Sequence, residues 1–419
     1  MYSFAHLSDV HLGFQKNVPL QQIEERVFED AIDQCIERKV DFVLIPGDLF
    51  HVNIPEMRVQ KFAVRKFRQL HEAGIPVYVV YGSHDFSPVS DSVIDLLTEA
   101  GYLTKVSKQK QSSDNTVSLE FTKDSKTGAK IVGLPGLTAG KELVYYENLD
   151  RESLESEDGF KIFLFHAGLA ELKFEVSAKT DFMPISLLPK GFDYYAGGHM
   201  HTHTLEKYPD YPNIVYPGTL FSGYYSDLEE NAKGRKRGFV LVQFDDKVRK
   251  VEFIPIDNVG YEIIEYNADK KNVKTVNLDL AKSVKEIDPG NKIVIIKVFG
   301  ELASGKTSEI DFTALREELK QNNVLEVKIN RTHLSSKDYN ITPASGKNKD
   351  EIETNVFKEN IGDVRLEQKE LLGDPGVKLA KKLLQELGQP SLVNEKKAQY
   401  QKRIEENAME LLELKINDS

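Results

Sequence analysis

The sequence predicts an α/β fold in which helices flank two central β-sheets packed as a sandwich. Over roughly the first 200 residues, short apolar runs such as Val77–Val80 alternate with amphipathic helices. Continuous apolar runs are typical of strands buried on both faces, and their alternation with helices is typical of layered α/β domains. From about Gly197 to Val259 the pattern becomes rich in strands, and the run Gly238–Phe244 is expected to complete the second sheet.

Two long helices are predicted between the first three strands. Apolar residues recur at helical spacing from Leu20 to Lys39 and again from Met57 to Ala73, where Gly74 marks the expected stop. In a fold of this kind, polar groups gather at the carboxyl ends of the strands. A functional site is therefore expected at that edge.

The rest of the chain divides into a small α/β unit, a linker and a helical tail. In the small unit, two strand-like runs flank a helix that carries Phe312, Leu315 and Leu319 on one face. The tail helices have an apolar stripe, which either docks on a helix of another protein or packs back on this chain. The predicted boundaries are 1–259 for the first domain, 260–333 for the small domain, 334–350 for the linker and 351–419 for the tail.

Composition limits the class of protein. A chain of 419 residues is expected to hold two or three domains. No apolar run approaches the roughly 18 residues of a membrane span, and the first residues do not follow a signal-peptide pattern. The single cysteine, Cys35, fits a reducing cytoplasm. The net charge of −11 argues against a generally basic nucleic-acid coat, but not against a local basic stripe that contacts phosphates.

Five polar clusters follow predicted strands and carry six of the ten histidines. Imidazoles and carboxylates mixed in one site suit divalent first-row metals such as Mn²⁺, Fe²⁺ or Zn²⁺. A lone histidine at a strand end is more often structural than a ligand, but five such clusters in order favour a metal site. The clusters are Asp9-Val10-His11, Gly47-Asp48-Leu49-Phe50-His51, Gly82-Ser83-His84-Asp85, Phe165-His166 and Gly198-His199-Met200-His201.

The spacing within the clusters predicts a site for two metals. Residues i and i+2 at a strand end point the same way, so Asp9 and His11 can face one ion. His199 and His201 share this geometry and can divide between two ions. Asp48 as a bridging carboxylate would hold the ions about 4 Å apart, which suits in-line phosphoryl displacement by an activated water. His84 is placed to donate a proton to the leaving group.

The set of clusters resembles the calcineurin-like metallophosphoesterase superfamily and, within it, the Mre/SbcD-type double-strand-break repair nucleases. The narrower resemblance depends on Gly47–His51, on the turn Tyr216-Pro217-Gly218-Thr219 and on the domain order. It covers essentially the whole chain, closely to about residue 255 and by architecture beyond it. It implies a four-layer phosphoesterase domain, a small DNA-capping domain and a C-terminal helical pair.

The resemblance also implies roles for single residues. His84 would be the catalytic acid, and His51 would lie near the scissile phosphate and position the substrate. The cofactors would be two Mn²⁺ per chain, and other divalent first-row metals would suit the same donors. The implied ligands are Asp9, His11, Asp48 and His201 for the first metal and Asp48, Ser83, His166 and His199 for the second.

Ser83 departs from the family pattern, which has asparagine at this position. A serine hydroxyl is a shorter oxygen donor than an amide, so it needs a backbone shift or an intervening water to reach the ion. We expect the second site to bind metal more weakly than is usual in the family. The alternative is a subfamily variant with unchanged affinity.

These expectations describe a manganese-dependent DNA exonuclease and endonuclease of double-strand-break repair, located in the cytoplasm at the nucleoid. The substrates would be double-strand ends, hairpins or single strands. The partner would be an SMC-like coiled-coil ATPase of the Rad/SbcC type, bound by the C-terminal helices. The resemblance also implies a homodimer, to which the apolar stretch Val89–Leu103 could contribute unless it belongs to the core. No membrane partner is expected.

Two other features leave alternatives open. The basic run Lys233–Arg237 is the best local candidate for contact with backbone phosphates, although such runs are usually solvated surface. His203 extends the His-x-His alternation but is expected to lie outside the ligand set. The rival functions are a phosphoesterase for small substrates and a non-catalytic scaffold that bridges DNA ends and the ATPase.

Overall fold

The computed structural model divides the chain into two compact units, one of residues 1–301 and 307–334 and one of residues 302–306 and 335–419. In the part of the chain that is described, no helix has both the length and the apolar character to cross a bilayer. Most of the predicted linker, residues 338–350, lies outside the described residues. The described residues are 1–87, 90–109, 116–137, 140–172, 182–221, 224–256, 259–337, 353–354, 357, 374–392, 395 and 397–412.

The first sheet has the strand order β14-β13-β1-β2-β3-β4. Its strands β1 to β4 are parallel, and β13 and β14 extend it as an antiparallel hairpin. All residues of β2 and β3 are buried, as their continuous apolar sequences predict. The strands are β1 (Tyr2–His6), β2 (Phe42–Pro46), β3 (Val77–Val80), β4 (Thr104–Lys105), β13 (Gly238–Phe244) and β14 (Val248–Pro255).

The second sheet has the order β11-β12-β10-β7-β6-β5. Its central strands β6, β7, β10 and β12 are parallel, with antiparallel neighbours at both edges. A separate pair is formed by β8 (Gly168–Leu169) and β9 (Phe182–Met183). The strands of the sheet are β5 (Thr122–Lys123), β6 (Lys130–Leu134), β7 (Lys161–His166), β10 (Tyr194–Gly198), β11 (Thr204–Tyr208) and β12 (Tyr211–Tyr216).

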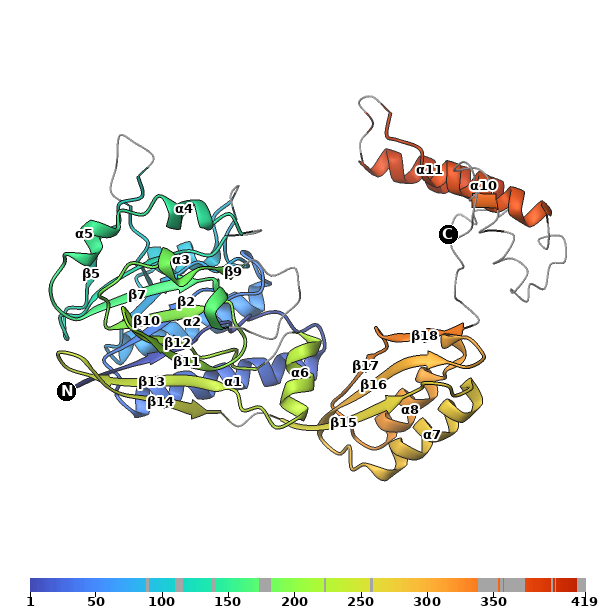
Figure 1. Ribbon diagram of the computed structural model, residues 1–419, viewed down its shortest axis with the longest axis horizontal. Coiled ribbons are helices and arrows are strands. Elements are labelled where there is room, and N and C mark those ends of the chain that lie inside the picture. Colours follow the sequence, from blue (N-terminus) through green and yellow to red (C-terminus); the bar gives the residue numbers. More distant parts are fainter. Residues whose placement is uncertain are drawn as a thin grey trace. The chain divides into compact units, whose positions relative to one another are not determined.

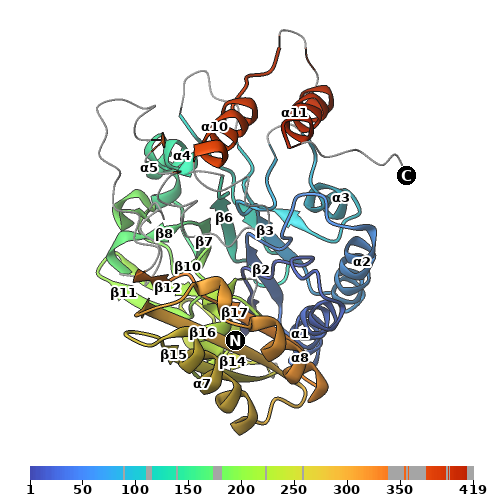
Figure 2. The same cartoon turned by 90° about the vertical axis from the view of Figure 1, so that its right-hand side faces the viewer.

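The two sheets pack face to face, with helices on their outer faces (Figures 1 and 2). Between the sheets, Phe4 stacks on Phe42 with ring centroids 5.0 Å apart and meets the edge of Tyr194 at 5.0 Å. The outer face of the first sheet is covered by α1 (Val18–Glu37), α2 (Met57–Glu72) and α3 (Val93–Glu99). The second is covered by α4 (Leu143–Glu147), α5 (Arg151–Glu155) and the turns Ala170–Leu172 and Ile185–Leu187. The predicted α/β sandwich is confirmed.

One helix was not expected. The segment Gly197–Val259, predicted to be rich in strands, also contains α6 (Tyr225–Ala232). Its eight residues are mostly polar and follow several strand-like runs, so no apolar periodicity identifies it in the sequence. This helix contributes to the site described below.

The small α/β unit packs against the first domain around α6. Ile293 and Ile295 are fully buried in the same apolar cluster as the helices of the first sheet. The Lys297 ammonium lies 2.6 Å from a Glu229 carboxylate oxygen, and the Asn330 amide donates to the same carboxylate at 3.0 Å. The elements are β15 (Gly260–Asn267), α7 (Val273–Glu286), β16 (Lys292–Leu302), the turn Thr307–Glu309, α8 (Phe312–Gln321), β17 (Glu326–Asn330) and β18 (Leu334–Ser336).

The tail forms two amphipathic helices, α10 (Asp374–Leu387) and α11 (Lys397–Leu411), that contact each other. Val377 and Ile404 are buried within the tail, whereas Leu384 and Leu387 are 45% and 53% exposed. Apolar surface thus remains on α10. Of the amphipathic segment Asn394–Leu414 of the sequence, residues 394, 396, 413 and 414 lie outside the described residues.

Candidate metal centre

The candidate ligands lie where strands of both sheets end. Asp9 follows β1, Asp48 follows β2, and His166 is the last residue of β7. Since β1 runs parallel to β2, and β7 runs parallel to β10, the carboxyl ends of each pair reach the same edge of their sheet. The His166 Nδ1 donates to the Pro46 carbonyl of the other sheet at 2.9 Å. The site is therefore built by both sheets.

The backbone at this edge is strained. Asp9, His11, Asp48 and His199 have positive φ angles of 50°, 51°, 50° and 88°, which non-glycine residues rarely adopt. Hydrogen bonds between the two loops hold this conformation, because the His11 amide donates to the Asp48 carbonyl at 2.9 Å. Strain of this kind persists where the surrounding fold enforces it and is concentrated at functional sites.

Two glycines allow the loops to approach each other. A Cβ at Gly82 would lie 2.1 Å from the Asp48 Oδ1, and a Cβ at Gly198 would lie 2.0 Å from the Pro46 oxygen. Neither contact is tolerated by a side chain. The glycines that precede Ser83 and His199 in the motifs are thus required by close packing around the carboxylate.

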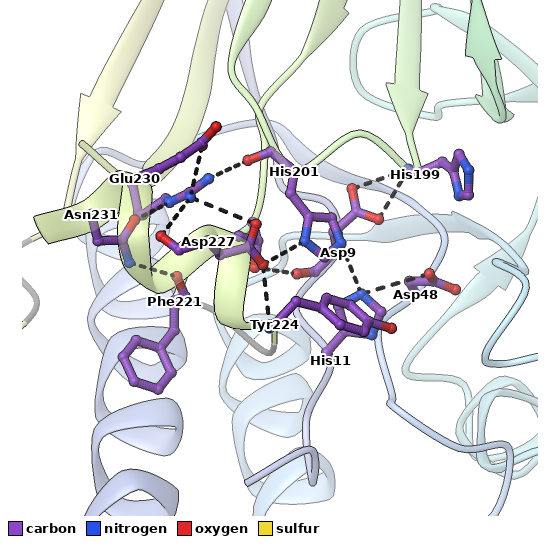
Figure 3. A network of polar contacts seen from close by, with 12 residues as sticks. Asp9, His11, Asp48, His199, His201, Phe221, Tyr224, Asp227, Glu230 and Asn231 are labelled. Atoms are coloured by element: carbon purple, nitrogen blue, oxygen red, sulfur yellow. Dashed lines mark hydrogen bonds and ion pairs between the residues drawn. The ribbon is translucent and has the colours of Figure 1, made fainter. Parts of the chain in front are cut away.

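Asp48 lies at the centre of the site. Its Oδ2 is 3.7 Å from the His11 Nε2 and 3.3 Å from the His166 Nε2. The His11 Nε2 is in turn 3.2 Å from the His201 Nε2 (Figure 3). Imidazole nitrogens that converge on one another and on a carboxylate provide the lone pairs that a divalent cation requires.

Partners on the far side of the rings fix which nitrogen faces the site. The His201 Nδ1 donates a hydrogen bond of 2.8 Å to the Asp227 carboxylate of α6. Together with the bond from His166 to Pro46, this directs the Nε2 of both rings toward the centre, as in metal-binding histidines. Arg237 supports Asp227 by donating to its carbonyl oxygen at 3.2 Å and to the His201 carbonyl. Sequence reasoning missed Asp227, because its helix was not predicted.

The residues fit a bound cation. The buried His11 Nδ1 and His51 Nδ1 have no hydrogen-bond partner among the described residues, and buried polar atoms of this kind usually have one. Within the described part of the chain, three groups of side chains have ligand atoms within 4.8 Å of one another. Two of them share Asp9, which is consistent with adjacent ion positions. The groups are Asp9, His11 and His201; Asp9, Asp48 and His166; and His11, His51 and His84.

Two predicted ligands are placed less directly. The His199 ring lies against His166, with centroids 5.3 Å apart, but His199 is in none of the three groups found among the described residues. Its amide donates to both Asp9 carboxylate oxygens, at 2.9 and 3.1 Å. Ser83 is half-buried in the turn after β3. Their role as ligands stays a prediction.

Electrostatics keep the central carboxylate ionised. Burial opposes ionisation of Asp48, but His166, His11 and His84 outweigh it and hold its pKa well below the usual range. Burial likewise lowers the pKa of His166, yet Asp48 and Asp9 raise it to about 10. Without a metal, the site thus holds a proton at His166 in place of a cation.

Asp85 has a structural role that its place in the motif did not reveal. Its carboxylate accepts hydrogen bonds from the amides of Leu49, Phe50 and Gly82, at 3.2, 2.9 and 3.0 Å. Burial and the nearby Asp48 raise the pKa of Asp85 to about 7. Asp85 therefore joins the second and third clusters behind the site.

His84 and His51 lie together at the rim. The His84 amide donates to the Asp48 Oδ1 at 2.9 Å, and its Nδ1 lies 2.8 Å from the His51 carbonyl oxygen. The two rings stack with centroids 4.8 Å apart. Burial, His84 and Lys16 lower the pKa of His51 to about 4, so His51 is neutral near pH 7. The Nε2 of His84 lies 3.2 Å from the Tyr224 hydroxyl oxygen.

His203 lies apart from the site. Its Nδ1 is 3.0 Å from the Tyr216 carbonyl oxygen, and its ring stacks on Phe253 with centroids 4.5 Å apart. In the described structure it thus packs among strand residues, as expected for a histidine outside the ligand set.

Comparisons with known proteins agree with this geometry. Residues 2–203 match the family model of calcineurin-like phosphoesterases. The DNA double-strand break repair protein Mre11 of Archaeoglobus fulgidus is 25% identical over 359 residues, covering 76% of this chain and 75% of that protein. Its namesake in Methanococcus maripaludis is 28% identical (68% and 73% covered), and that of Sulfurisphaera tokodaii is 30% identical (63% and 65% covered).

The fold, the site and these similarities define a metal-dependent phosphodiesterase. Residues 2–203 are similar to the calcineurin-like phosphoesterases, whose family model they match.

Proposed function

We propose that this protein is a manganese-dependent DNA nuclease of double-strand-break repair. The observation that carries the proposal is the position of Asp48, whose carboxylate meets His11 and His166 on one side and the amide of His84 on the other. A metal-binding carboxylate and a proton donor are thus joined in one site. The repair role and the DNA substrate are supported by the names of the similar proteins.

The proposed ligands are those of the motifs. Two Mn²⁺ ions held there would supply an activated water and positive charge for the phosphate. Asp227 orients His201 through its Nδ1, and the strained loops hold Asp9, His11 and Asp48 before any ion arrives. Residues proposed to hold the ions are Asp9, His11, Asp48 and His201 for one, and Asp48, Ser83, His166 and His199 for the other.

The chain's own residues then act on the substrate. His84 donates a proton from Nε2 to the leaving sugar oxygen, and its Nδ1 stays bonded to the His51 carbonyl. The neutral His51 ring stacks beside it and can position the scissile phosphate without competing for the proton. Both rings are partly exposed.

The central experiment compares linear duplex DNA and DNA hairpins incubated with Mn²⁺ and the purified protein. His84→Ala is expected to lower cleavage about 10²- to 10⁴-fold, the contribution of a positioned general acid. His71→Ala, on the exposed surface of α2, is the matched control and should be fully active. If His84→Ala cleaves DNA as fast as the natural chain, the proposed acid is wrong.

Metal binding is tested separately by electron paramagnetic resonance of Mn²⁺. Two coupled ions are expected for the natural chain, and Asp48→Asn should abolish the coupled signal. A single uncoupled ion in the natural chain would contradict the shared site.

The rival functions predict different outcomes. A small-substrate phosphoesterase would hydrolyse a chromogenic monoester as well as a diester and leave DNA intact. A scaffold would bind DNA ends with no metal-dependent cleavage. The tail favours the repair nuclease, because its exposed leucines on α10 provide a surface for a coiled-coil ATPase partner, which a small-molecule phosphatase does not need.

The predicted homodimer receives less support. In α3, Val93, Ile94 and Leu97 are buried in the core, whereas Leu96 is 56% exposed. Val89 lies outside the described residues. A dimer through this helix would have to use Leu96 and neighbouring surfaces.

A further inference from the structure

Tyr224, which no motif singles out, contacts the proposed proton donor. Its hydroxyl oxygen lies 3.2 Å from the His84 Nε2. Its ring lies beside His11 and His201, with centroids 6.0 and 5.4 Å away, at the position shown in Figure 3. The side chain is still 39% exposed. Tyr224 thus stands between the candidate metal ligands and the open side of the site.

The position of Tyr224 is fixed from two sides. Its amide lies 3.4 Å from the same Asp227 oxygen that accepts from His201. Its ring packs on Phe14, with centroids 5.4 Å apart. One carboxylate, that of Asp227 at the start of α6, therefore holds both the candidate ligand His201 and Tyr224.

The hydrogen bonds of His84 define its tautomer. The His51 carbonyl oxygen only accepts, so the Nδ1 of His84 must carry a proton. In the neutral ring, Nε2 then has a lone pair and accepts from the Tyr224 hydroxyl. When the ring is protonated, Nε2 donates to the same hydroxyl oxygen. A hydroxyl can donate to the neutral ring and accept from the protonated ring, whereas an amide or a carboxylate cannot fill both roles equally well.

We propose that Tyr224 is a positioning residue for proton donation by His84, an inference that rests on the proposed hydrolysis of phosphodiesters. During cleavage, a water oxygen forms a bond to phosphorus and the bond from phosphorus to the leaving oxygen breaks. The leaving oxygen keeps the electron pair and takes the proton from the His84 Nε2. The water loses one proton to solvent, and His84 regains one from solvent. Tyr224 keeps its proton and turns its hydroxyl to donate to the bare Nε2.

The test uses two esters of thymidine 5′-monophosphate that differ only in their need for a proton. A 4-nitrophenyl group leaves without protonation, whereas a phenyl group benefits from it. Tyr224→Phe keeps the ring and removes the hydroxyl. We expect its kcat to fall roughly tenfold on the phenyl ester, a part of the ~10²- to 10⁴-fold effect of a general acid, and less than about twofold on the 4-nitrophenyl ester.

A double substitution tests whether both residues act on one step. Tyr224→Phe combined with His84→Ala should be no slower on the phenyl ester than His84→Ala alone. Equal losses on both esters would mean that the hydroxyl only maintains the shape of the site. A faster Tyr224→Phe enzyme would mean that the hydroxyl obstructs the substrate. Either result overturns the inference but leaves the proposed nuclease intact.

A measurement without turnover separates the inference from the nuclease proposal. In metal-free protein with ¹⁵N-labelled histidine, the His84 signals are identified by their loss in His84→Gln. We expect a ring protonated at Nδ1, with an Nε2 signal that moves on Tyr224→Phe and does not move on Tyr208→Phe, whose hydroxyl lies near the Glu171 carbonyl instead. An Nε2 signal unchanged by Tyr224→Phe contradicts the inference. A natural chain inactive on DNA and on both esters contradicts the proposed function itself.

Discussion

Individual residues reach the candidate site by different routes. Asp9 and His11 belong to one group of possible ligands with His201, although both have left-handed rather than extended backbones. Their spacing of two positions after a strand identifies them in the sequence. Asp227 and Tyr224 could not be predicted in this way. They reach the site from a short polar helix, and only the tertiary fold brings that helix beside His201.

The serine in the third cluster leads to the first prediction. Ser83→Asn restores the longer oxygen donor of the family, so half-maximal cleavage should need several-fold less Mn²⁺. Titration of DNA cleavage against Mn²⁺ measures this, with Ser87→Asn in the same loop as the control. If the Asn variant at position 83 needs as much Mn²⁺ as the natural chain, Ser83 is a variant of equal affinity.

Glu24 leads to a prediction on pH. This buried carboxylate of α1 accepts from the amides of Gly13 and Gln15, at 2.8 and 3.4 Å. Burial raises its pKa from 4.5 to about 7 despite those bonds. The folded state therefore binds this proton more tightly than the unfolded state does. The stabilisation of the fold by protonated Glu24 is complete below pH 4.5 and is lost as the pH rises through about 7.

The measurement is urea unfolding of metal-free protein between pH 4.5 and 8. Relative to Glu24→Gln, which does not titrate, the natural chain should lose up to roughly 3 kcal/mol of unfolding free energy over this range. A difference between the two proteins that is the same at every pH would show that Glu24 ionises normally in the fold.

At the scale of elements, the strands were predicted more reliably than the helices that interrupt them. β2 and β3 are continuous apolar runs, and their burial on both faces follows from that composition alone. The helix α6 has no such signature, because it buries only Leu228 as an apolar residue. It is held by polar contacts of its Asp227 and Asn231 with His201 and Arg237. Its existence depends on the domain around it.

The exposed apolar face of α10 leads to a prediction on the partner. Replacing Leu384 and Leu387 with serine removes surface that a coiled coil would cover, at a cost of about 1.5–3 kcal/mol for each fully buried leucine. Binding to an SMC-like coiled-coil ATPase should weaken at least tenfold in a titration by fluorescence anisotropy. Leu278→Ser, on the exposed side of α7, is the control because it is 63% exposed. Equal binding by the double variant and the control would exclude α10 from the interface.

At the scale of the whole molecule, charge is distributed unevenly. The net charge is −11, but the run Lys233–Arg237 is basic. This run directly precedes β13, and the first residues of β13 pair with the carboxyl end of β1. The basic run therefore lies at the edge of the sheet that carries the candidate metal centre. A cavity of about 390 Å³ there is lined by Arg235, Lys236 and Arg237. Arg237 is buried and bonded to Asn231, so only part of the run is presented to solvent.

This arrangement predicts the salt dependence of DNA binding. Arg235→Ala combined with Lys236→Ala should reduce the slope of log K against log salt by about one for each phosphate that the variant no longer neutralises. Lys39→Ala combined with Lys247→Ala is the control. Lys39 comes just before β2 and Lys247 just after β13, which places both at the opposite edge of the sheet. If the first pair leaves the slope unchanged, the run lies off the DNA path.

Because the candidate ligands come from the ends of both sheets, a bound ion would tie one half of the sandwich to the other. His166 of the second sheet meets Asp48 of the first at 3.3 Å, so unfolding either half must release the cation. Metal occupancy would then raise the thermal stability of the protein. At a free ion concentration of 100 times Kd, one occupied site adds about 2.7 kcal/mol to the free energy of unfolding. A melting curve recorded with and without Mn²⁺ would report how tightly the two halves are joined, before any substrate is added.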